Sequence, residues 1–123
     1  MDRILVADDN EDVRFSVIDG LKSISRSYSF IEAQNGKEAI DKLKKEKIDL
    51  VGLDIMMPLM DGWEVATSMK QDPKLKGIPI IFLTAKNDEL TKEMGKLTGN
   101  DFIEKPFILH DLDKRIKRVL GKR

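Results

Sequence analysis

Five polar side chains stand where apolar stretches of this sequence end. Asp8 and Asp9 follow the first stretch, Asp54 follows the third, Thr84 closes the fourth, and Lys105 follows the fifth. Three carboxylates in one cleft would repel one another by roughly 1 to 4 kcal/mol per pair at about 4 Å, so they need a counter-charge. A divalent cation would supply it, and a set of oxygen donors favours Mg²⁺ over zinc or copper.

A lysine and a threonine beside such a carboxylate cluster would add groups that can bind a phosphoryl group. A carboxylate can act as a nucleophile. A metal ion and an ammonium can neutralise phosphoryl oxygens, and a hydroxyl can bind one of them. The residue types therefore suit phosphoryl transfer to an aspartate, provided that the fold brings them together.

The elements that must position these side chains alternate along the chain. Apolar stretches typical of strands cover residues 4–7, 28–33, 48–53, 78–83 and 102–103. Helical spacing of apolar residues falls within 13–24, 39–43, 65–69, 90–97 and 112–120. This alternation predicts an α/β fold, a doubly wound five-stranded parallel sheet of flavodoxin-like order 2-1-3-4-5 with five helices. In such sheets the site lies beyond the carboxyl ends of the strands.

Length and composition limit the number of domains and the classes of function that this chain can have. The 123 residues predict one domain spanning 1–123, and we expect a stand-alone domain because the chain ends soon after the last predicted helix. The 22 basic and 22 acidic side chains leave no net field that would draw the molecule to nucleic acid or to a membrane. Cysteine is absent, which favours the cytoplasm. We find no signal peptide and no apolar run near the roughly 20 residues of a membrane helix.

Four motifs, in this order, resemble the receiver domains of two-component response regulators over essentially the full length of the chain. They are Asp8-Asp9, the block Leu-Asp-Ile-Met-Met-Pro-Leu-Met-Asp-Gly at 53–62, Leu-Thr-Ala at 83–85, and Lys-Pro-Phe at 105–107. The resemblance implies a phosphorylation switch. It implies Asp54 as the phosphoryl acceptor and Asp9 as a direct Mg²⁺ ligand, with Asp8 acting through water and Met56 through its backbone carbonyl.

The resemblance also implies the parts of a switch. Lys105 would pair with the acceptor and then with the phosphoryl group, after a cis peptide bond to Pro106. Thr84 would move to hydrogen-bond the phosphoryl group, and Phe102 would fill the space behind it. These movements would alter the surface of the fourth helix, fifth strand and fifth helix. Many relatives have tyrosine at position 102, so a readout that needs a hydroxyl is not expected here.

The expected donor is a phosphohistidine on a sensor histidine kinase or a histidine phosphotransfer protein, and the expected readout is a downstream protein target. We expect a monomer or weak homodimer that catalyses its own phosphorylation and dephosphorylation but is not an enzyme with an external product. An apolar Met56 cannot orient an attacking water molecule, which suggests a longer-lived phosphorylated state.

Simpler interpretations exist for single residues. Asp8 and Asp9 could cap the first helix together with Asn10, and Lys105 could be a solvated surface residue. Methionines near the acceptor more often fill apolar gaps than bind soft metals. The remaining candidates are His110, expected at the surface, Trp63, expected in packing, and a basic run at 114–123 that suits a helix C-terminus better than DNA.

Three other functions are compatible with parts of this pattern. A flavodoxin-like electron carrier shares the topology, but it needs a phosphate-binding loop where this chain has five consecutive polar residues, four of them acidic, at 8–12. A Mg²⁺-dependent phosphatase usually has its nucleophile after the first strand and a cap over the substrate. A receiver that no longer takes phosphate would act as a fixed binding module, although every residue that the chemistry needs is present.

Overall fold

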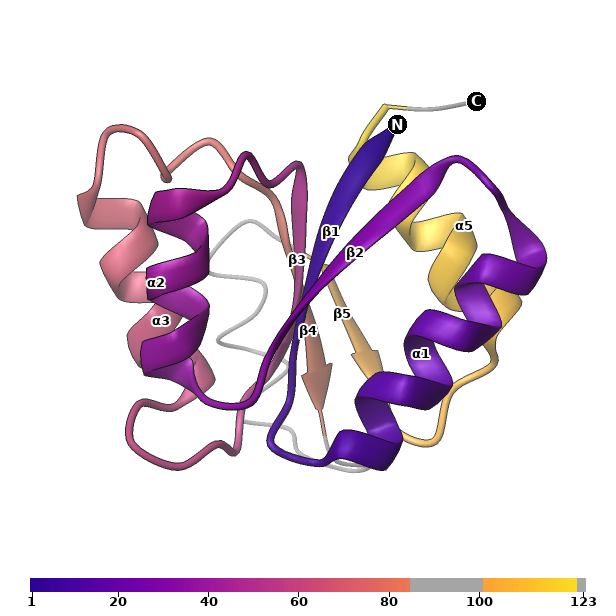
Figure 1. Cartoon of the computed structure of the whole chain (residues 1–123), viewed down its shortest axis with the longest axis horizontal. Helices are drawn as coiled ribbons and strands as arrows, with labels where there is room; N and C mark the ends of the chain where they lie inside the picture. The colour runs from indigo at the N-terminus through magenta and orange to yellow at the C-terminus, as the bar shows by residue number, and fades with distance from the viewer. Residues whose placement is uncertain (85–100, 122–123) are drawn as a thin grey trace.

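A computed structural model describes residues 1–84 and 101–121, where four helices cover a five-stranded parallel sheet (Figure 1). The strands are β1 (Asp2–Ala7), β2 (Tyr28–Ala33), β3 (Leu50–Asp54), β4 (Ile80–Thr84) and β5 (Asp101–Glu104). The helices are α1 (Glu11–Ile24), α2 (Gly36–Lys45), α3 (Gly62–Gln71) and α5 (Leu109–Val119). The strand order is β2-β1-β3-β4-β5, which confirms the predicted sheet. The helix predicted within 90–97 lies outside the described residues.

The helices form two layers. In Figure 1, α2 and α3 lie on one side of the sheet and α1 and α5 on the other. The near-continuous apolar strands supply side chains to both faces, so each face has its own core. Leu5, Val51 and Phe82 belong to the core beneath α2 and α3, whereas Ile4 and Ile81 belong to the core beneath α1 and α5.

Local polar side chains fix where the helices begin. Asn10 caps α1 by accepting hydrogen bonds from the N–H groups of Asp12 and Val13, and Asn35 caps α2 in the same way. Asp61 and Glu64 form a reciprocal capping box at α3. The cap of α1 is therefore Asn10, and the interpretation of Asp8 and Asp9 as capping side chains is wrong.

Two strand predictions begin too early. Ile48 and Ile78 are apolar and were expected in strands, but β3 begins at Leu50 and β4 at Ile80. Ile48 is buried and Ile78 half-buried against the core, so both residues pack from the connecting segments. An apolar residue indicates burial, but it does not show at which residue the hydrogen bonds of the sheet begin.

Gly62 allows α3 to begin close to the end of β3. A Cβ atom at this position would lie 2.5 Å from the Asp54 carbonyl oxygen and 2.8 Å from Ile55 Cα, both of which are backbone atoms. The Gly62 N–H donates a hydrogen bond to the Ile55 carbonyl over 2.8 Å. The packing of α3 therefore fixes the backbone that carries Asp54.

No helix in residues 1–84 or 101–121 is long and apolar enough to cross a lipid bilayer. That the whole of 1–123 forms one domain stays a prediction.

Candidate functional site

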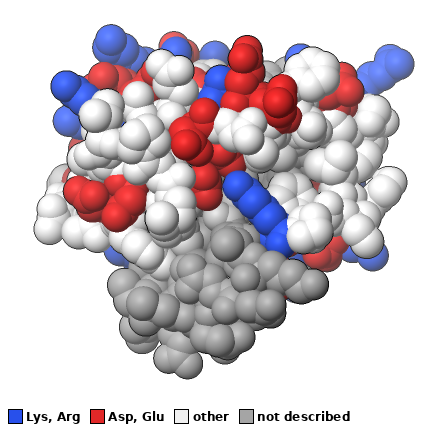
Figure 2. Space-filling view, turned by 90° about the horizontal axis from the view of Figure 1, so that it is seen from below, with Lys and Arg blue, Asp and Glu red and all other residues white. Residues whose placement is uncertain are grey.

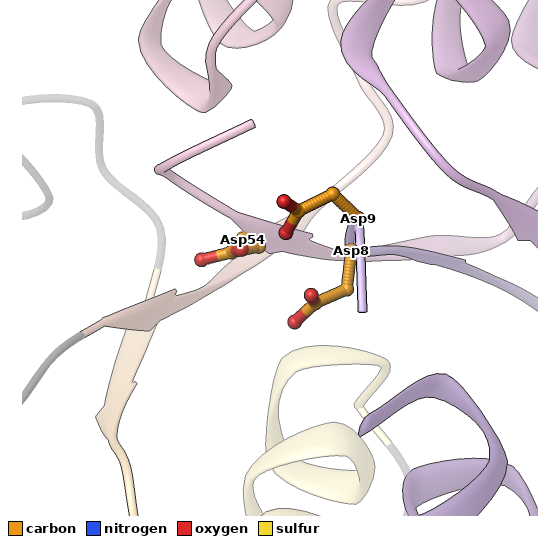
Figure 3. A group of neighbouring side chains, drawn as sticks. All are labelled: Asp8, Asp9 and Asp54. Atoms are coloured by element: carbon orange, nitrogen blue, oxygen red, sulfur yellow. The ribbon is translucent and has the colours of Figure 1, made fainter. Parts of the chain in front are cut away.

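Three carboxylates meet at the carboxyl edge of the sheet. β1 and β3 are neighbours in register, with Ala7 opposite Leu53, so the residues that follow β1 come next to Asp54 at the end of β3. One ligand oxygen from each of Asp8, Asp9 and Asp54 lies within 4.8 Å of the other two. Figure 3 shows the three side chains at the ends of these strands. The convergence predicted from the sequence is therefore present.

A lysine ammonium lies against this cluster. Lys105 Nζ is 2.9 Å from Asp8 Oδ2 and 3.6 Å from Asp54 Oδ1, although Lys105 is 97 positions from Asp8 in the sequence. The Lys105-Pro106 peptide bond is cis, as predicted. Figure 2 looks onto this edge and shows acidic side chains gathered over it. The site thus combines three carboxylates with one cation.

Hydrogen bonds hold the Asp8 segment in place. Asp8 is 1% exposed, and its Oδ1 accepts the Asn10 N–H over 2.9 Å. Arg14 Nη1 donates to the Asp8 carbonyl oxygen over 2.6 Å, while its Nε pairs with Glu32 at 3.0 Å. Sequence patterns gave no sign of this Arg14 contact, because it joins α1 to the loop after β1 only in the folded chain.

Burial makes Asp54 harder to ionise. The side chain is 8% exposed, and desolvation is the main cause that raises its pKa from 3.8 to about 6. The neighbouring Asp8 charge raises this pKa further, whereas Lys105 and the backbone N–H groups of Ile55 and Met56 lower it. The lysine therefore offsets part of the charge repulsion, and the carboxylate remains under-compensated.

The donor set fits a hard divalent cation. The three clustered groups are carboxylates, with two of them buried and Asp9 exposed toward solvent. Mg²⁺ prefers oxygen ligands, keeps several waters, and is commonly bound through one or two carboxylates. The charge of Asp8 adds to burial in raising the pKa of Asp54, and a bound cation would act in the opposite direction. The residues present can therefore hold Mg²⁺.

Three further residues that were predicted to act at the site lie outside the carboxylate cluster or are described only in part. The backbone of Thr84 ends β4 opposite Glu104, but the position of its side chain lies outside what the structure describes. Phe102 on β5 is half-buried against the core. Met56 is 76% exposed, so the interpretation of Met56 as an apolar gap-filler is wrong, whereas Met57 is buried in the core.

The simpler interpretations of two other residues agree with the structure. Trp63 is half-buried and packs against the core, with its ring centroid 4.7 Å from that of Phe82. His110 is exposed on α5.

Part of the basic run of α5 is engaged within the molecule. Arg115 Nη1 donates to Asp101 Oδ1 and to the Phe102 carbonyl, both at 2.9 Å. Arg118 Nη2 also reaches Asp101, at 3.2 Å. These arginines tie α5 to β5.

α5 also carries a buried carboxylate that no sequence pattern distinguishes from a surface one. Asp113 is 4% exposed, accepts a 2.5 Å hydrogen bond from the Tyr28 hydroxyl, and pairs with Lys117 at 2.9 Å. Burial and the hydrogen bond to Asp113 both raise the pKa of Tyr28. The pair links the first residue of β2 to the middle of α5.

Comparison with known proteins assigns this arrangement to a family. The model of the response regulator receiver domain matches residues 4–117. The alkaline phosphatase synthesis transcriptional regulatory protein PhoP of Bacillus subtilis is 39% identical over 98% of this chain and 49% of that protein. The chain spans about half the length of the curated relatives it matches.

Solved structures agree. The chemotaxis response regulator CheY4 of Vibrio cholerae has a TM-score of 0.86 at 31% identity, covering 97% of this chain and 98% of that one. A CheY-like receiver domain protein of Methanospirillum hungatei has a TM-score of 0.80 at 36% identity, covering 97% and 94%.

Proposed function

The chain belongs to the response regulator receiver domain family of two-component signalling, and on that premise we propose that Asp54 accepts a phosphoryl group in a Mg²⁺-dependent reaction. The observation that carries the proposal is the position of the Lys105 ammonium, 2.9 Å from Asp8 and 3.6 Å from Asp54. A fixed cation beside a buried, under-compensated carboxylate suits a group that arrives with negative oxygens.

In the proposed step, an Asp54 carboxylate oxygen attacks the phosphorus of a phosphohistidine. The bond from phosphorus to the imidazole nitrogen breaks, its electron pair stays on that nitrogen, and an aspartyl phosphate forms. Lys105 then pairs with a phosphoryl oxygen, and the Thr84 hydroxyl hydrogen-bonds another. The donor is a sensor histidine kinase or a histidine phosphotransfer protein in the cytoplasm. The chain promotes its own phosphorylation and releases no external product.

Asp9 and Asp54 would hold Mg²⁺ directly, with Asp8 acting through water and Met56 contributing its backbone carbonyl. When bound, Mg²⁺ offsets the charge of the carboxylates and of the phosphoryl oxygens. Asp8 has a second task, because its Oδ2 keeps the Lys105 ammonium at the site. The three carboxylates therefore have distinct roles within one cluster.

The proposed readout is a change at the surface of β5 and α5, which controls a downstream protein target. Phe102 is half-buried and its backbone carbonyl is bonded to Arg115, so its ring can change position within the core while the strand stays attached to α5. We further propose that the chain acts as a monomer or weak homodimer, without contact to nucleic acid or membrane.

Incubation with Mg²⁺ and a small acyl phosphate, followed by intact mass measurement, tests the proposal. We expect a mass increase of one phosphoryl group, which is lost in Asp54→Asn and when a chelator removes the metal. Asp41→Asn, an exposed carboxylate on α2, is the matched control and should be phosphorylated normally. An unmodified wild-type chain would instead support a receiver that acts as a fixed binding module.

A further inference from the structure

We propose that the edge of the sheet opposite the carboxylates carries a second interaction surface, which binds an acidic peptide segment of a protein partner through one apolar anchor residue. The surface is a groove between the C-terminal end of α2 and the segment that follows α3. These segments lie at the upper edge in Figure 1, whereas the strands that carry the site end at the lower edge. This inference does not depend on phosphorylation of Asp54.

The groove has the size and floor to receive a side chain. Its volume is about 450 Å³, within the range of roughly 300 to 1,000 Å³ typical of binding pockets. Its floor is apolar, and its residues belong to the hydrophobic core or pack against it. The floor residues are Leu43, Ile48, Leu75 and Ile78. An aliphatic or aromatic side chain entering the groove would therefore meet a preformed apolar surface.

The rim of the groove is basic, and its positive charges lack partners within the described chain. Lys44, Lys47 and Lys74 line the rim and are exposed. In residues 1–84 and 101–121, no ion pair joins any of these three ammonium groups to a carboxylate. The two acidic residues of the rim are already engaged. Glu46 pairs with Arg3 at 3.5 Å, and Asp72 Oδ1 accepts the backbone N–H of Lys74.

The helix dipole explains only part of this charge. Lys44 lies in the last turn of α2, where a cation stabilises the C-terminal end of the helix. Lys47 lies beyond α2, and Lys74 lies beyond α3, so neither belongs to the last turn of its helix. Three unpaired cations around an apolar floor match a ligand that carries carboxylates on either side of an apolar residue.

An acidic peptide fits these features better than nucleic acid does. Phosphate backbones would use the lysines but would leave the apolar floor uncovered, whereas a peptide of Asp and Glu around a Leu or Phe uses both. The groove and the carboxylate cluster occupy opposite ends of the strands, so a partner held at the groove would leave the Asp54 site accessible to a phosphodonor. The surface therefore suits a protein that stays attached during signalling.

A titration of the full chain, followed by NMR chemical shifts, tests the inference. The probe is a short synthetic peptide of Glu and Asp residues flanking a single Phe. We expect saturable shifts at Leu43, Ile48, Leu75 and Ile78 at micromolar to millimolar peptide, with weaker binding at high salt. A peptide with Ser in place of the Phe should bind at least about fivefold more weakly, because it loses the apolar anchor.

The charge requirement is tested by reversing three lysines at a time. Combining Lys44→Glu, Lys47→Glu and Lys74→Glu should weaken peptide binding by about tenfold or more. Combining Lys22→Glu, Lys37→Glu and Lys114→Glu, all exposed elsewhere, gives the same net charge and should leave binding within about twofold. The inference is overturned by equal weakening in both triple variants, by no binding at millimolar peptide, or by a single-stranded oligonucleotide that binds the groove more tightly than the peptide.

Discussion

The Lys105 ammonium lies closer to Asp8 than to Asp54, at 2.9 Å against 3.6 Å. Asp8 is almost fully buried, so its charge has few other partners and keeps the lysine at the site. Asp8 therefore places the lysine beside Asp54, although the shortest contact of Lys105 is the one with Asp8. A phosphoryl group on Asp54 would bring new oxygens toward an ammonium that is already positioned.

Lys105→Met should slow phosphorylation by roughly 10² to 10³-fold, because it removes the fixed cation that faces the incoming phosphoryl oxygens. The same change should raise the pKa of Asp54, which Lys105 now lowers. Rates measured by mass with a small acyl phosphate check the first effect, and NMR titration of Asp54 checks the second. Lys37→Met, at an exposed position on α2, is the control. Phosphorylation of Lys105→Met at the wild-type rate would argue against the proposed role.

Asp54→Asn should stabilise the metal-free protein at neutral pH. With a pKa of about 6 when folded against 3.8 as the ordinary value, native Asp54 keeps a proton that the unfolded chain releases. Native stability therefore falls as pH rises between these two values, by up to about 3 kcal/mol at an upper limit. Urea unfolding from pH 4 to 7 should show the advantage of Asp54→Asn growing with pH. Mg²⁺ should reduce that advantage, and Asp41→Asn should show no such trend.

Gly62→Ala should destabilise the fold by roughly 1 to 3 kcal/mol, since the added Cβ would overlap the backbone of Asp54 and Ile55. Gly77→Ala is the matched control, because a Cβ there meets no atom within 4 Å among the described residues. Its stability should change by less than about 1 kcal/mol. Urea unfolding compares the two variants, and equal effects would show that the approach of α3 to β3 is not tight.

Tyr28→Phe should destabilise the protein by about 1 to 3 kcal/mol, because it leaves the buried Asp113 carboxylate without the phenol donor. In an Asp113→Asn background the same change should cost less. A double-mutant cycle measured by urea unfolding gives the coupling between the two side chains. Additive effects would mean that the short hydrogen bond contributes little to stability.

Met56→Asn should shorten the life of the phosphorylated form, since an amide can orient a water molecule that the exposed thioether cannot. Decay of the phosphorylated mass after removal of the donor measures this lifetime. Met56→Leu, which stays apolar, should decay like the wild type. An unchanged lifetime in Met56→Asn would contradict the hypothesis.

Much of the framework could be predicted from the sequence, because burial of apolar strands and the carboxyl-end rule depend on local patterns. Residues 28–33 were predicted as a strand with the bounds that β2 has. The convergence of Asp8, Asp9 and Asp54 followed from the strand order alone. The pairs Asn35-Gly36 and Asp61-Gly62 predict the starts of α2 and α3, and both helices begin there because the Asn35 and Asp61 side chains cap them.

Contacts between distant segments were not predictable. Tyr28 and Asp113 are 85 positions apart, and nothing in either local pattern distinguishes them from a core tyrosine and a surface aspartate on an amphipathic helix. The contact of Arg14 with the Asp8 carbonyl and the basic rim around an apolar floor likewise exist only once the elements are packed. Such features require the relative placement of elements, which periodicity does not encode.

The bond from Arg115 to the carbonyl of Phe102 has a consequence for how information crosses this molecule. The bond holds the main chain of β5 to α5 and does not involve the aromatic ring, which packs against the core beneath α2 and α3. A partner that binds at β5 and α5 would then meet side chains in new positions, while the spacing between the two backbones stays the same.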